Sequence, residues 1–205
     1  LPLCMFDLIL LPEHDRAPNR SNIFRTTGML SPVTAGEKDH CKGVIMLGGV
    51  NKHFHWDNDA VAEQVTTLTA AMPQVHWQIS DSPRTPATLK EKLSLPDNAS
   101  LVHWRDTPDG WLSNQLATSN YVWVSADSAS MVYEALSHGG RVGAIELPPY
   151  KEKNKLVRGL GLLFDKGLLG RSSHGSLELQ KLNDLTLSEH TRCAQWIVAK
   201  WFAQV

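Results

Sequence analysis

The stretch YVWVSADSASMVYEALSHGGRVGAIELP, residues 121–148, decides the fold because it reads as strand, helix and strand in succession. Residues 121–125 and 141–148 are short apolar runs with the length of buried strands. Residues 128–139 between them have the pattern of a helix, and two glycines follow at its end. Two strands joined through a helix run in the same direction with a right-handed crossover, so this stretch predicts a parallel sheet.

The same alternation extends outward from this stretch. The run KGVIMLGG (42–49) is nearly continuous in apolar residues, as in a parallel strand covered on both faces. Apolar residues at spacings of four, three and four predict an amphipathic helix over 58–72. Thr85 reads as the N-cap, and Pro86 as the first residue, of a helix over 85–94. Further strands are expected at 75–80 and 100–104, and further helices at 109–119, 152–166 and 188–203.

Five strands separated by helices between residues 42 and 148 predict an α/β fold, with an open parallel Rossmann-like sheet that helices cover on both faces. Two earlier runs, 6–12 and 22–28, also read as strands. The polar stretch 31–41 reads as a linker, and we place a domain boundary near it. Because the chain starts without Met and almost at once in a strand, we expect that an N-terminal part of the protein is missing.

Composition excludes several classes of protein. The 205 residues are 42% apolar and carry a net charge of −1, which is ordinary for a globular protein and gives no electrostatic basis for binding nucleic acid. No stretch is long enough to span a bilayer, and the opening LPLCMFDLILLP lacks the basic start of a signal peptide. Three widely spaced cysteines favour a reducing compartment, so we expect a cytoplasmic protein. Peripheral membrane contact and the oligomeric state stay open.

The start of the predicted helix 128–139 has the features of a phosphate site. Open parallel sheets bind ligands at the carboxyl ends of their strands, and this helix follows the strand 121–124 directly. The first amides of a helix are unpaired and carry partial positive charge, and small residues let phosphate oxygens approach them. The alternative is an ordinary N-cap followed by a solvated glutamate. We assign diphosphate binding to Asp127, Ser128, Ala129 and Ser130, and contact with the two ribose hydroxyls to Glu134.

Two other loops at the same rim add candidates. Gly48 and Gly49 follow a strand, where paired glycines allow positive φ and a close approach of phosphate to the backbone. They form neither a dinucleotide-binding fingerprint nor a P-loop. Arg84, in the loop SPRTP, could neutralise phosphate, and the alternative is a solvated arginine.

Trp56 and its neighbours are the remaining candidates. Trp56 lies in a predicted rim loop, where it could stack on a base or a sugar or fill a hinge. His53, His55 and Asp57 lack the ligand spacing of a metal site, so we expect no metal. No cofactor is expected either.

Together these motifs resemble the mitochondrial fission factor (elongated-mitochondria) family, which has many bacterial members of unassigned function. The resemblance rests on LGGVNKHFHWD (47–57), SPRTP (82–86) and SADSASMVYEALSHGGRVGAIEL (125–147), and FDLILLPEHD (6–15) with NIFRTTGML (22–30) supports it. It covers most of residues 6–175. The family in turn is similar to GT-B glycosyltransferases, which consist of two Rossmann-like domains.

This resemblance implies that residues 41–205 are the nucleotide-sugar (donor) binding domain and that residues 1–40 are a remnant of the N-terminal domain and a linker. It places Gly48 and Gly49 in the first phosphate loop, Ser128 to Ser130 at the diphosphate and Glu134 at the ribose. Pro83 stands where the family usually has a second arginine, so a shared phosphate role falls to Arg84 alone. The turn HGGRV likewise replaces the common Gly-x-Pro-Val, which reads as a structural change.

The implied activity is that of a glycosyltransferase-like protein that takes a nucleotide sugar as substrate and displaces the nucleoside diphosphate. The resemblance also implies that most of the acceptor domain, which normally helps to supply the catalytic base, lies outside this sequence. His14 and Asp15 are the nearest candidates for that base. The alternative function is a non-catalytic adaptor that recruits protein partners, as the eukaryotic relatives imply.

Overall fold

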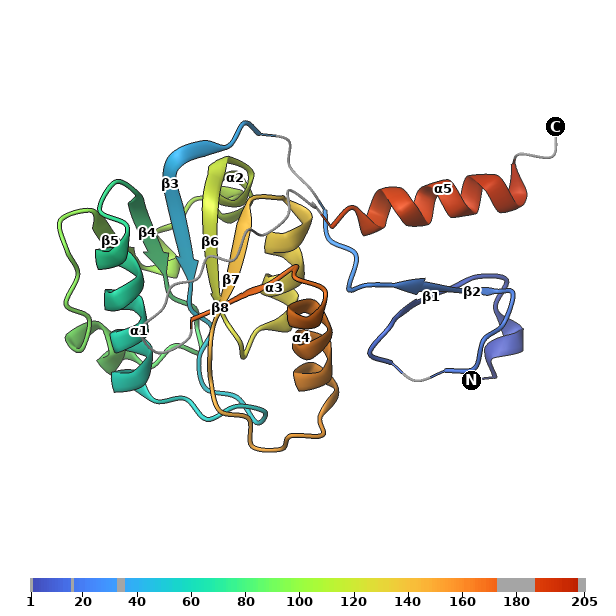
Figure 1. The fold of residues 1–205 in the computed structure, drawn as a ribbon, viewed down its shortest axis with the longest axis horizontal. Coiled ribbons are helices and arrows are strands. Elements are labelled where there is room, and N and C mark those ends of the chain that lie inside the picture. Colours follow the sequence, from blue (N-terminus) through green and yellow to red (C-terminus); the bar gives the residue numbers. More distant parts are fainter. Residues whose placement is uncertain (1, 16, 33–35, 173–186, 203–205) are drawn as a thin grey trace.

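The computed structural model describes residues 2–15, 17–32, 36–172 and 187–202. Its main element is a six-stranded parallel sheet with the strand order β5-β4-β3-β6-β7-β8 (Figure 1). The strands of this sheet are β3 (Asp39–Met46), β4 (His76–Ser80), β5 (Ala99–Val102), β6 (Ser119–Ser125), β7 (Arg141–Ile145) and β8 (Gly170–Arg171).

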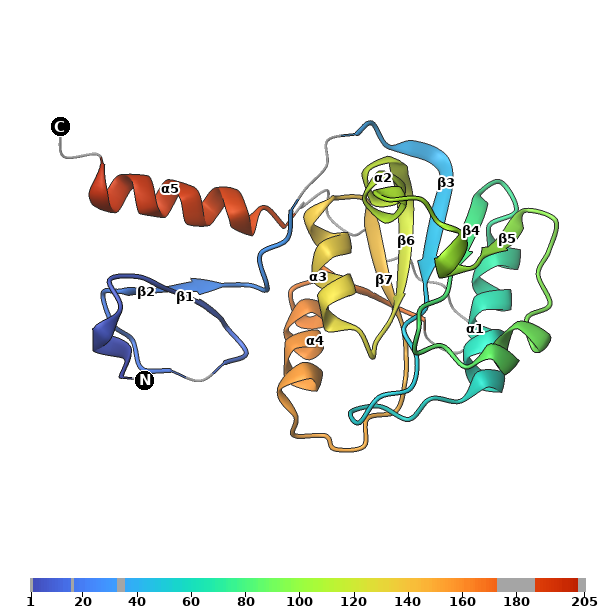
Figure 2. The ribbon, with the colours of Figure 1, turned by 180° about the vertical axis from the view of Figure 1, so that it is seen from behind.

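The strand order identifies the topology. From β3 the chain steps outward to β5, then crosses back to β6 and steps outward the other way to β8. This is the 3-2-1-4-5-6 order of the Rossmann fold. Right-handed crossovers that reverse direction place α1 (Asn58–Ala71) on one face of the sheet and α2 (Trp111–Thr118) and α3 (Ala129–Ser137) on the other (Figures 1 and 2). The Rossmann-like fold predicted from the sequence is therefore confirmed.

The remaining helices are α4 (Lys155–Asp165) and α5 (Glu189–Trp201). Short 3₁₀ helices cover Leu3–Met5, Ala87–Glu91 and Trp104–Asp106.

Two tryptophans in the sheet each lie over a glycine of the neighbouring strand. Trp77 is paired with Gly43, and Trp123 is paired with Gly143. Both rings are 1% exposed. A Cβ atom added to Gly43 would lie 2.4 Å from the Trp77 ring, and one added to Gly143 would lie 2.3 Å from the Trp123 ring. Each glycine is therefore needed to seat a large buried side chain.

The two ends of the chain pack together beside the large sheet. The strands β1 (Ile9–Pro12) and β2 (Ile23–Thr26) form a separate parallel pair, and α5 lies along β2. The rings of Phe24 and Trp196 are 4.9 Å apart between centroids. The buried Glu189 accepts hydrogen bonds from the Thr27 amide at 2.9 Å and from Arg192 at 2.6 Å. The domain boundary at residues 31–41 stays a prediction.

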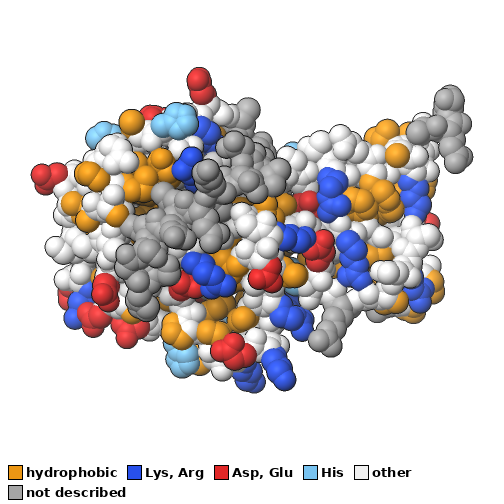
Figure 3. All heavy atoms as spheres, in the orientation of Figure 1, with side chains coloured by type: hydrophobic (Ala, Val, Ile, Leu, Met, Phe, Trp, Pro, Cys, Tyr) orange, Lys and Arg blue, Asp and Glu red, His pale blue; other side chains and the backbone are white. Residues whose placement is uncertain are grey.

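Cationic and aromatic side chains alternate on this part of the surface. In Figure 3, Lys and Arg side chains lie between hydrophobic ones over α5 and the β1–β2 pair. The Lys200 ammonium lies 4.8 Å from the ring centroid of Trp196 and 4.9 Å from that of Trp201. The Arg192 guanidinium lies 4.6 Å from the Phe24 ring. The Arg192–Phe24 cation–π pair joins α5 to β2, whereas the two Lys200 pairs lie within α5 itself.

One predicted helix is wrong in type and in its cap. Residues Ala87–Glu91 form a short 3₁₀ helix instead of an α-helix over 85–94, and Pro86 occupies the N-cap position. The Thr85 hydroxyl instead donates to the carbonyl oxygens of Leu47 and Gly48. Tertiary hydrogen bonds to the end of β3 thus replace the local cap. The short edge strand β8 was not predicted.

The loop after β1 packs against α3 and α4. The His14 ring stacks on Tyr133 of α3, with an interplanar angle of 15° and 3.4 Å between Nδ1 and the Tyr133 hydroxyl. Asp15 lies 3.8 Å from Lys155, and Arg158 donates to the His14 carbonyl oxygen. Burial lowers the pKa of His14, and burial raises the pKa of Tyr133 to about 12. This loop therefore favours a neutral imidazole.

We expect Gly143→Ala to lower the free energy of unfolding by about 1–3 kcal/mol, because the added methyl group overpacks the Trp123 ring. The matched control is Gly161→Ala in α4, where the added Cβ meets nothing within 4 Å and should raise helix stability by about 0.5–1 kcal/mol. Urea unfolding followed by tryptophan fluorescence measures both. Equal stability of the two variants would contradict the packing argument.

The lowered pKa of His14 makes stability depend on pH. Its usual value is 6.5, so the unfolded chain binds more protons than the folded chain as the pH falls below that value. Stability should therefore drop as pH falls from 7.5 to 5.5. We expect His14→Gln to flatten this dependence, whereas His76→Gln, at an exposed position on β4, should not. Urea unfolding of both variants at the two pH values checks this, and parallel curves for wild type and His14→Gln would refute it.

Candidate functional site

The candidate site lies at the carboxyl ends of β3 and β6, where the strand order reverses. Ligands of open α/β sheets bind in the crevice outside this point. The turn after β3 contains Gly48 and Gly49, and β6 ends at Ser125, from which residues 126–128 lead into α3. The structure brings these predicted turns together, because the Gly48 amide donates to the Ser125 hydroxyl at 2.7 Å.

Asp127 is the centre of the polar contacts between these turns. Its carboxylate accepts hydrogen bonds from the Gly49 amide at 3.0 Å and from the Ser125 hydroxyl at 2.5 Å. Arg84 donates to the same carboxylate at 2.8 Å. The Asp127 carbonyl oxygen accepts from the side-chain amide of Asn51. The Asp127 carboxylate therefore makes tertiary contacts and does not cap α3.

Arg84 is held at the site by its loop and by Asp127. The hydroxyls of Ser82 and Thr85, on either side of it, both donate to the Gly48 carbonyl oxygen. The loop therefore packs tightly on the glycine turn, where Gly49 has a φ of 147° and a Cβ would lie 2.1 Å from the Arg84 carbonyl oxygen. The Arg84 side chain remains 41% exposed while that of Asp127 is fully buried. The Arg84 guanidinium thus contacts Asp127, while part of the Arg84 side chain is open to solvent.

The first turn of α3 has no side-chain cap. Asp57 caps α1 and Asn154 caps α4, each by accepting two backbone amides, but the Ser128 side chain makes no capping bond. Within the described residues, the amides of residues 129–131 donate no hydrogen bond, and the first intrahelical bond runs from the Val132 amide to the Ser128 carbonyl oxygen. Ser130 is exposed, and Ala129 and Glu134 are half-buried. The free amides therefore open toward a partly accessible surface.

Two rim loops join beside this helix start. Phe54 and Pro149 form an antiparallel bridge, with hydrogen bonds from His55 to Pro148 and from Tyr150 to His53. The rings of His55 and Tyr150 are 3.7 Å apart between centroids. In the described part of the chain, no three His, Cys, Asp or Glu side chains are grouped to hold a metal ion.

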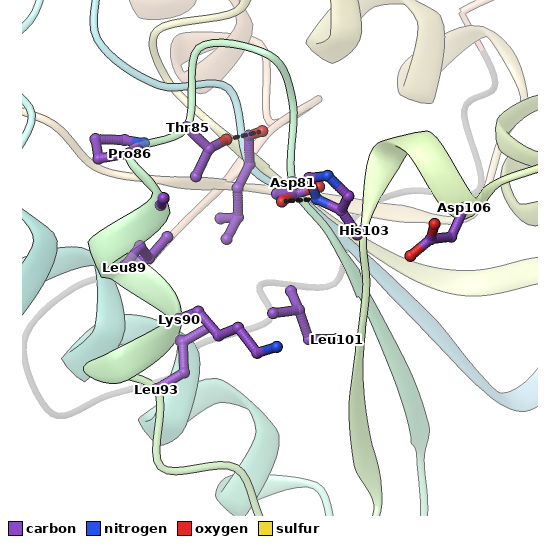
Figure 4. A pocket seen from close by; sticks show the side chains of 11 residues that line it. Asp81, Thr85, Pro86, Leu89, Lys90, Leu93, Leu101, His103 and Asp106 are labelled. Atoms are coloured by element: carbon purple, nitrogen blue, oxygen red, sulfur yellow. Dashed lines mark hydrogen bonds and ion pairs between the residues drawn. The ribbon is translucent and has the colours of Figure 1, made fainter.

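A cavity of about 430 Å³ opens at the same rim, at the ends of β4 and β5 (Figure 4). Leucines form its walls, and Asp81 lies with His103 at one end. The Asp81 carboxylate lies 2.6 Å from Nδ1 of His103 and accepts from the Trp104 amide at 2.7 Å. Thr85 also lines the cavity, so the loop that holds Arg84 separates the cavity from Asp127. The apolar lining residues are Leu47, Pro86, Ala87, Leu89, Leu93 and Leu101.

The other predicted residues lie around this centre. Asp15 is beside Lys155, the first residue of α4, so the candidate bases lie next to α3 and α4. The Trp56 ring packs against the core, and its Nε1 donates to Asn58 at 2.8 Å, so it is anchored at the start of α1. Its stacking role stays a prediction.

Sequence reasoning missed Ser125, Asp81 and His103 as individual contributors. Each is at or directly after the end of a strand, which is the signal that could have identified it. What the sequence could not show are the long-range partners, Gly48 for Ser125 and the pairing of Asp81 with His103, because these residues follow different strands.

No helix of the described residues is long and apolar enough to cross a membrane. A search of curated proteins finds no significant match. Among solved structures, the putative UDP-N-acetylglucosamine 2-epimerase from Listeria monocytogenes has a TM-score of 0.51 at 12% identity, and the match covers 87% of this chain and 51% of that one.

Two other solved structures are similar at lower scores. Spinosyn rhamnosyltransferase SpnG has a TM-score of 0.46 at 16% identity, with 80% of this chain and 38% of that chain covered. A structure of the GtfA/B complex has a TM-score of 0.42 at 13% identity, with 89% and 40% covered. The chain thus spans between 38% and 51% of these proteins. The likeness to the Listeria epimerase, at a TM-score of 0.51, supports the Rossmann-like fold.

A profile of the family described as Mitochondrial fission ELM1 matches residues 1–201, which is nearly the whole sequence. The match agrees with the motifs at the rim, since the loops around Gly48, Arg84 and Ser128 are the segments that resemble this family. The chain belongs to the mitochondrial fission ELM1 family.

Proposed function

We propose that this chain binds a nucleotide-activated sugar as the donor half of a glycosyltransferase-like protein. The observation that carries this proposal is the uncapped start of α3, whose free amides lie beside Arg84 at the switch point of the sheet. Backbone amides, the helix dipole and a guanidinium together favour a diphosphate. The names of the similar solved structures, a rhamnosyltransferase and a putative UDP-sugar epimerase, are consistent with such a ligand.

The chemistry of the neighbouring side chains assigns places to the ribose and to the base of the nucleotide. Glu134 lies one turn beyond Ser130 on α3 and is half-buried, so its carboxylate would accept hydrogen bonds from the ribose hydroxyls. The cavity beside Thr85 would take the base, because its leucine walls suit a flat heterocycle. Charges of both signs line it, Asp81 and Asp106 with Lys90, so the apolar walls and not the charge favour the base over a phosphate there.

The proposed reaction displaces the nucleoside diphosphate from the sugar. The amides of residues 129–131 and Arg84 would stabilise the negative charge that develops on the leaving diphosphate. His14 or Asp15 would act as the base toward the acceptor, since both lie beside α3 and α4. Because the lowered pKa of His14 keeps the imidazole neutral, it could accept a proton near neutral pH.

Calorimetry with UDP, GDP, ADP and CMP on the full-length protein tests the binding. We expect at least one nucleotide to bind and Glu134→Gln to weaken it roughly tenfold, because a charged acceptor of the ribose hydroxyls is lost. The matched control is Glu63→Gln at an exposed position on α1, which should bind like wild type. No heat from any nucleotide would end the proposal and favour the adaptor function.

A second measurement tests the base cavity separately. Leu93→Trp would fill the cavity and should weaken the binding of the nucleoside diphosphate roughly tenfold or more. Inorganic pyrophosphate lacks a base, so its affinity should not change. Val198→Trp at an exposed position on α5 is the control. An equal loss for both ligands would show that the substitution disturbs the phosphate site, and no loss for either would show that the base lies elsewhere.

A further inference from the structure

The Asp127 carboxylate is surrounded by hydrogen-bond donors of the kinds that bind anions. A backbone amide (Gly49), a hydroxyl (Ser125) and a guanidinium (Arg84) converge on its two oxygens at 2.5–3.0 Å. The side chain is fully buried. Glycine-turn amides, hydroxyls and arginine are also the groups with which proteins bind phosphate. The geometry is therefore that of a phosphate subsite in which a side chain of the protein takes the place of the phosphate.

The glycine turn is shaped around this carboxylate. A Cβ added to Gly48 would lie 2.2 Å from Oδ2 of Asp127, and the Gly48 amide is used by Ser125. The Gly49 amide is used by Asp127 itself. A phosphate at the Gly48–Gly49 turn would thus meet a buried negative charge and no free amide on that turn. The free amides at the rim of these two turns are those of residues 129–131 in the described chain.

We propose that Asp127 is a specificity-determining residue, whose carboxylate fills the anion subsite of the glycine turn and confines an incoming phosphate to α3 and the outer side of Arg84. The confinement of an incoming phosphate to α3 and Arg84 rests on the proposed function. The filling of the anion subsite by the Asp127 carboxylate does not. The carboxylate excludes free orthophosphate from the turn, because two anions cannot share three donors in a buried space. It also leaves the exposed side of Arg84 for a diphosphate that reaches the α3 amides.

Removing the carboxylate should create an orthophosphate site. Asp127→Ala and Asp127→Ser vacate the space and leave Gly49, Ser125 and Arg84 as donors. We expect both variants to bind orthophosphate roughly tenfold or more tightly than wild type, because a buried like charge is removed beside three donors. Calorimetry with sodium phosphate at constant ionic strength measures this. Both variants should also melt at lower temperature than wild type and regain stability in phosphate but not in chloride.

Two controls separate the proposal from a general charge effect. Glu146→Gln removes a carboxylate from the same rim, directly after β7, that pairs with Arg171, and it should not gain phosphate affinity. Adding Arg84→Gln to Asp127→Ala removes one of the three donors and should abolish the gain. Asp127→Asn keeps the volume and removes only the charge, so its gain should be smaller than that of Asp127→Ala.

The outcomes decide each half of the proposal. Phosphate affinity at the wild-type level in folded Asp127→Ala or Asp127→Ser overturns it. If those variants do not fold, they are refolded in sodium phosphate and in sodium chloride, and failure of phosphate to restore the folded state overturns the proposal as well. A phosphate gain in Asp127→Ala together with no nucleotide binding in wild type would support the filled subsite and defeat the proposed function. Nucleotide binding in wild type without any phosphate gain in the variants would support the proposed function and defeat the filled subsite.

Discussion

The buried carboxylate of Asp127 joins three segments that are distant in sequence. It holds the glycine turn after β3, the SPRTP loop after β4 through Arg84, and the start of α3 after β6. A buried charge is stable only when donors surround it, so the three segments must stay in register for Asp127 to remain paired. The shape of the candidate site, including the exposed side of Arg84 and the free amides of α3, depends on this one group.

The sheet beneath the site is a rigid support for these loops. Trp77 over Gly43 and Trp123 over Gly143 fix the spacing of four adjacent strands, and both rings are fully buried. Loops on a rigid scaffold are the usual place for binding residues, because the loops can vary while the strands beneath them cannot. The rim of this sheet follows that division, with apolar strands below and hydroxyl, acidic and basic side chains above.

The contacts of the chain ends add a second constraint. The His14–Asp15 loop packs on α3 and α4, while Glu189 of α5 holds the Thr27 amide after β2. The N-terminal strands are therefore attached to the large sheet from one side and to the last helix from the other. This arrangement brings the candidate bases next to the helix that carries Ser130 and Glu134, which no local pattern in residues 1–40 could indicate.

The sequence by itself determined the elements whose signal is local. The apolar spacing over 58–72 identified α1, and the strand–helix–strand pattern of 121–148 predicted β6, α3, β7 and the parallel sheet, because periodicity reflects which faces are buried. It failed at Thr85, whose hydroxyl bonds to the end of β3, and at the two-residue strand β8, which is too short for a periodic pattern. Only the tertiary structure decided that Asp127 contacts the glycine turn and Arg84 instead of capping its own helix. The physical reason is that a carboxylate takes the strongest donors within reach, and two of them, Gly49 and Arg84, lie in loops after β3 and β4, whose place in the sheet the local sequence does not encode.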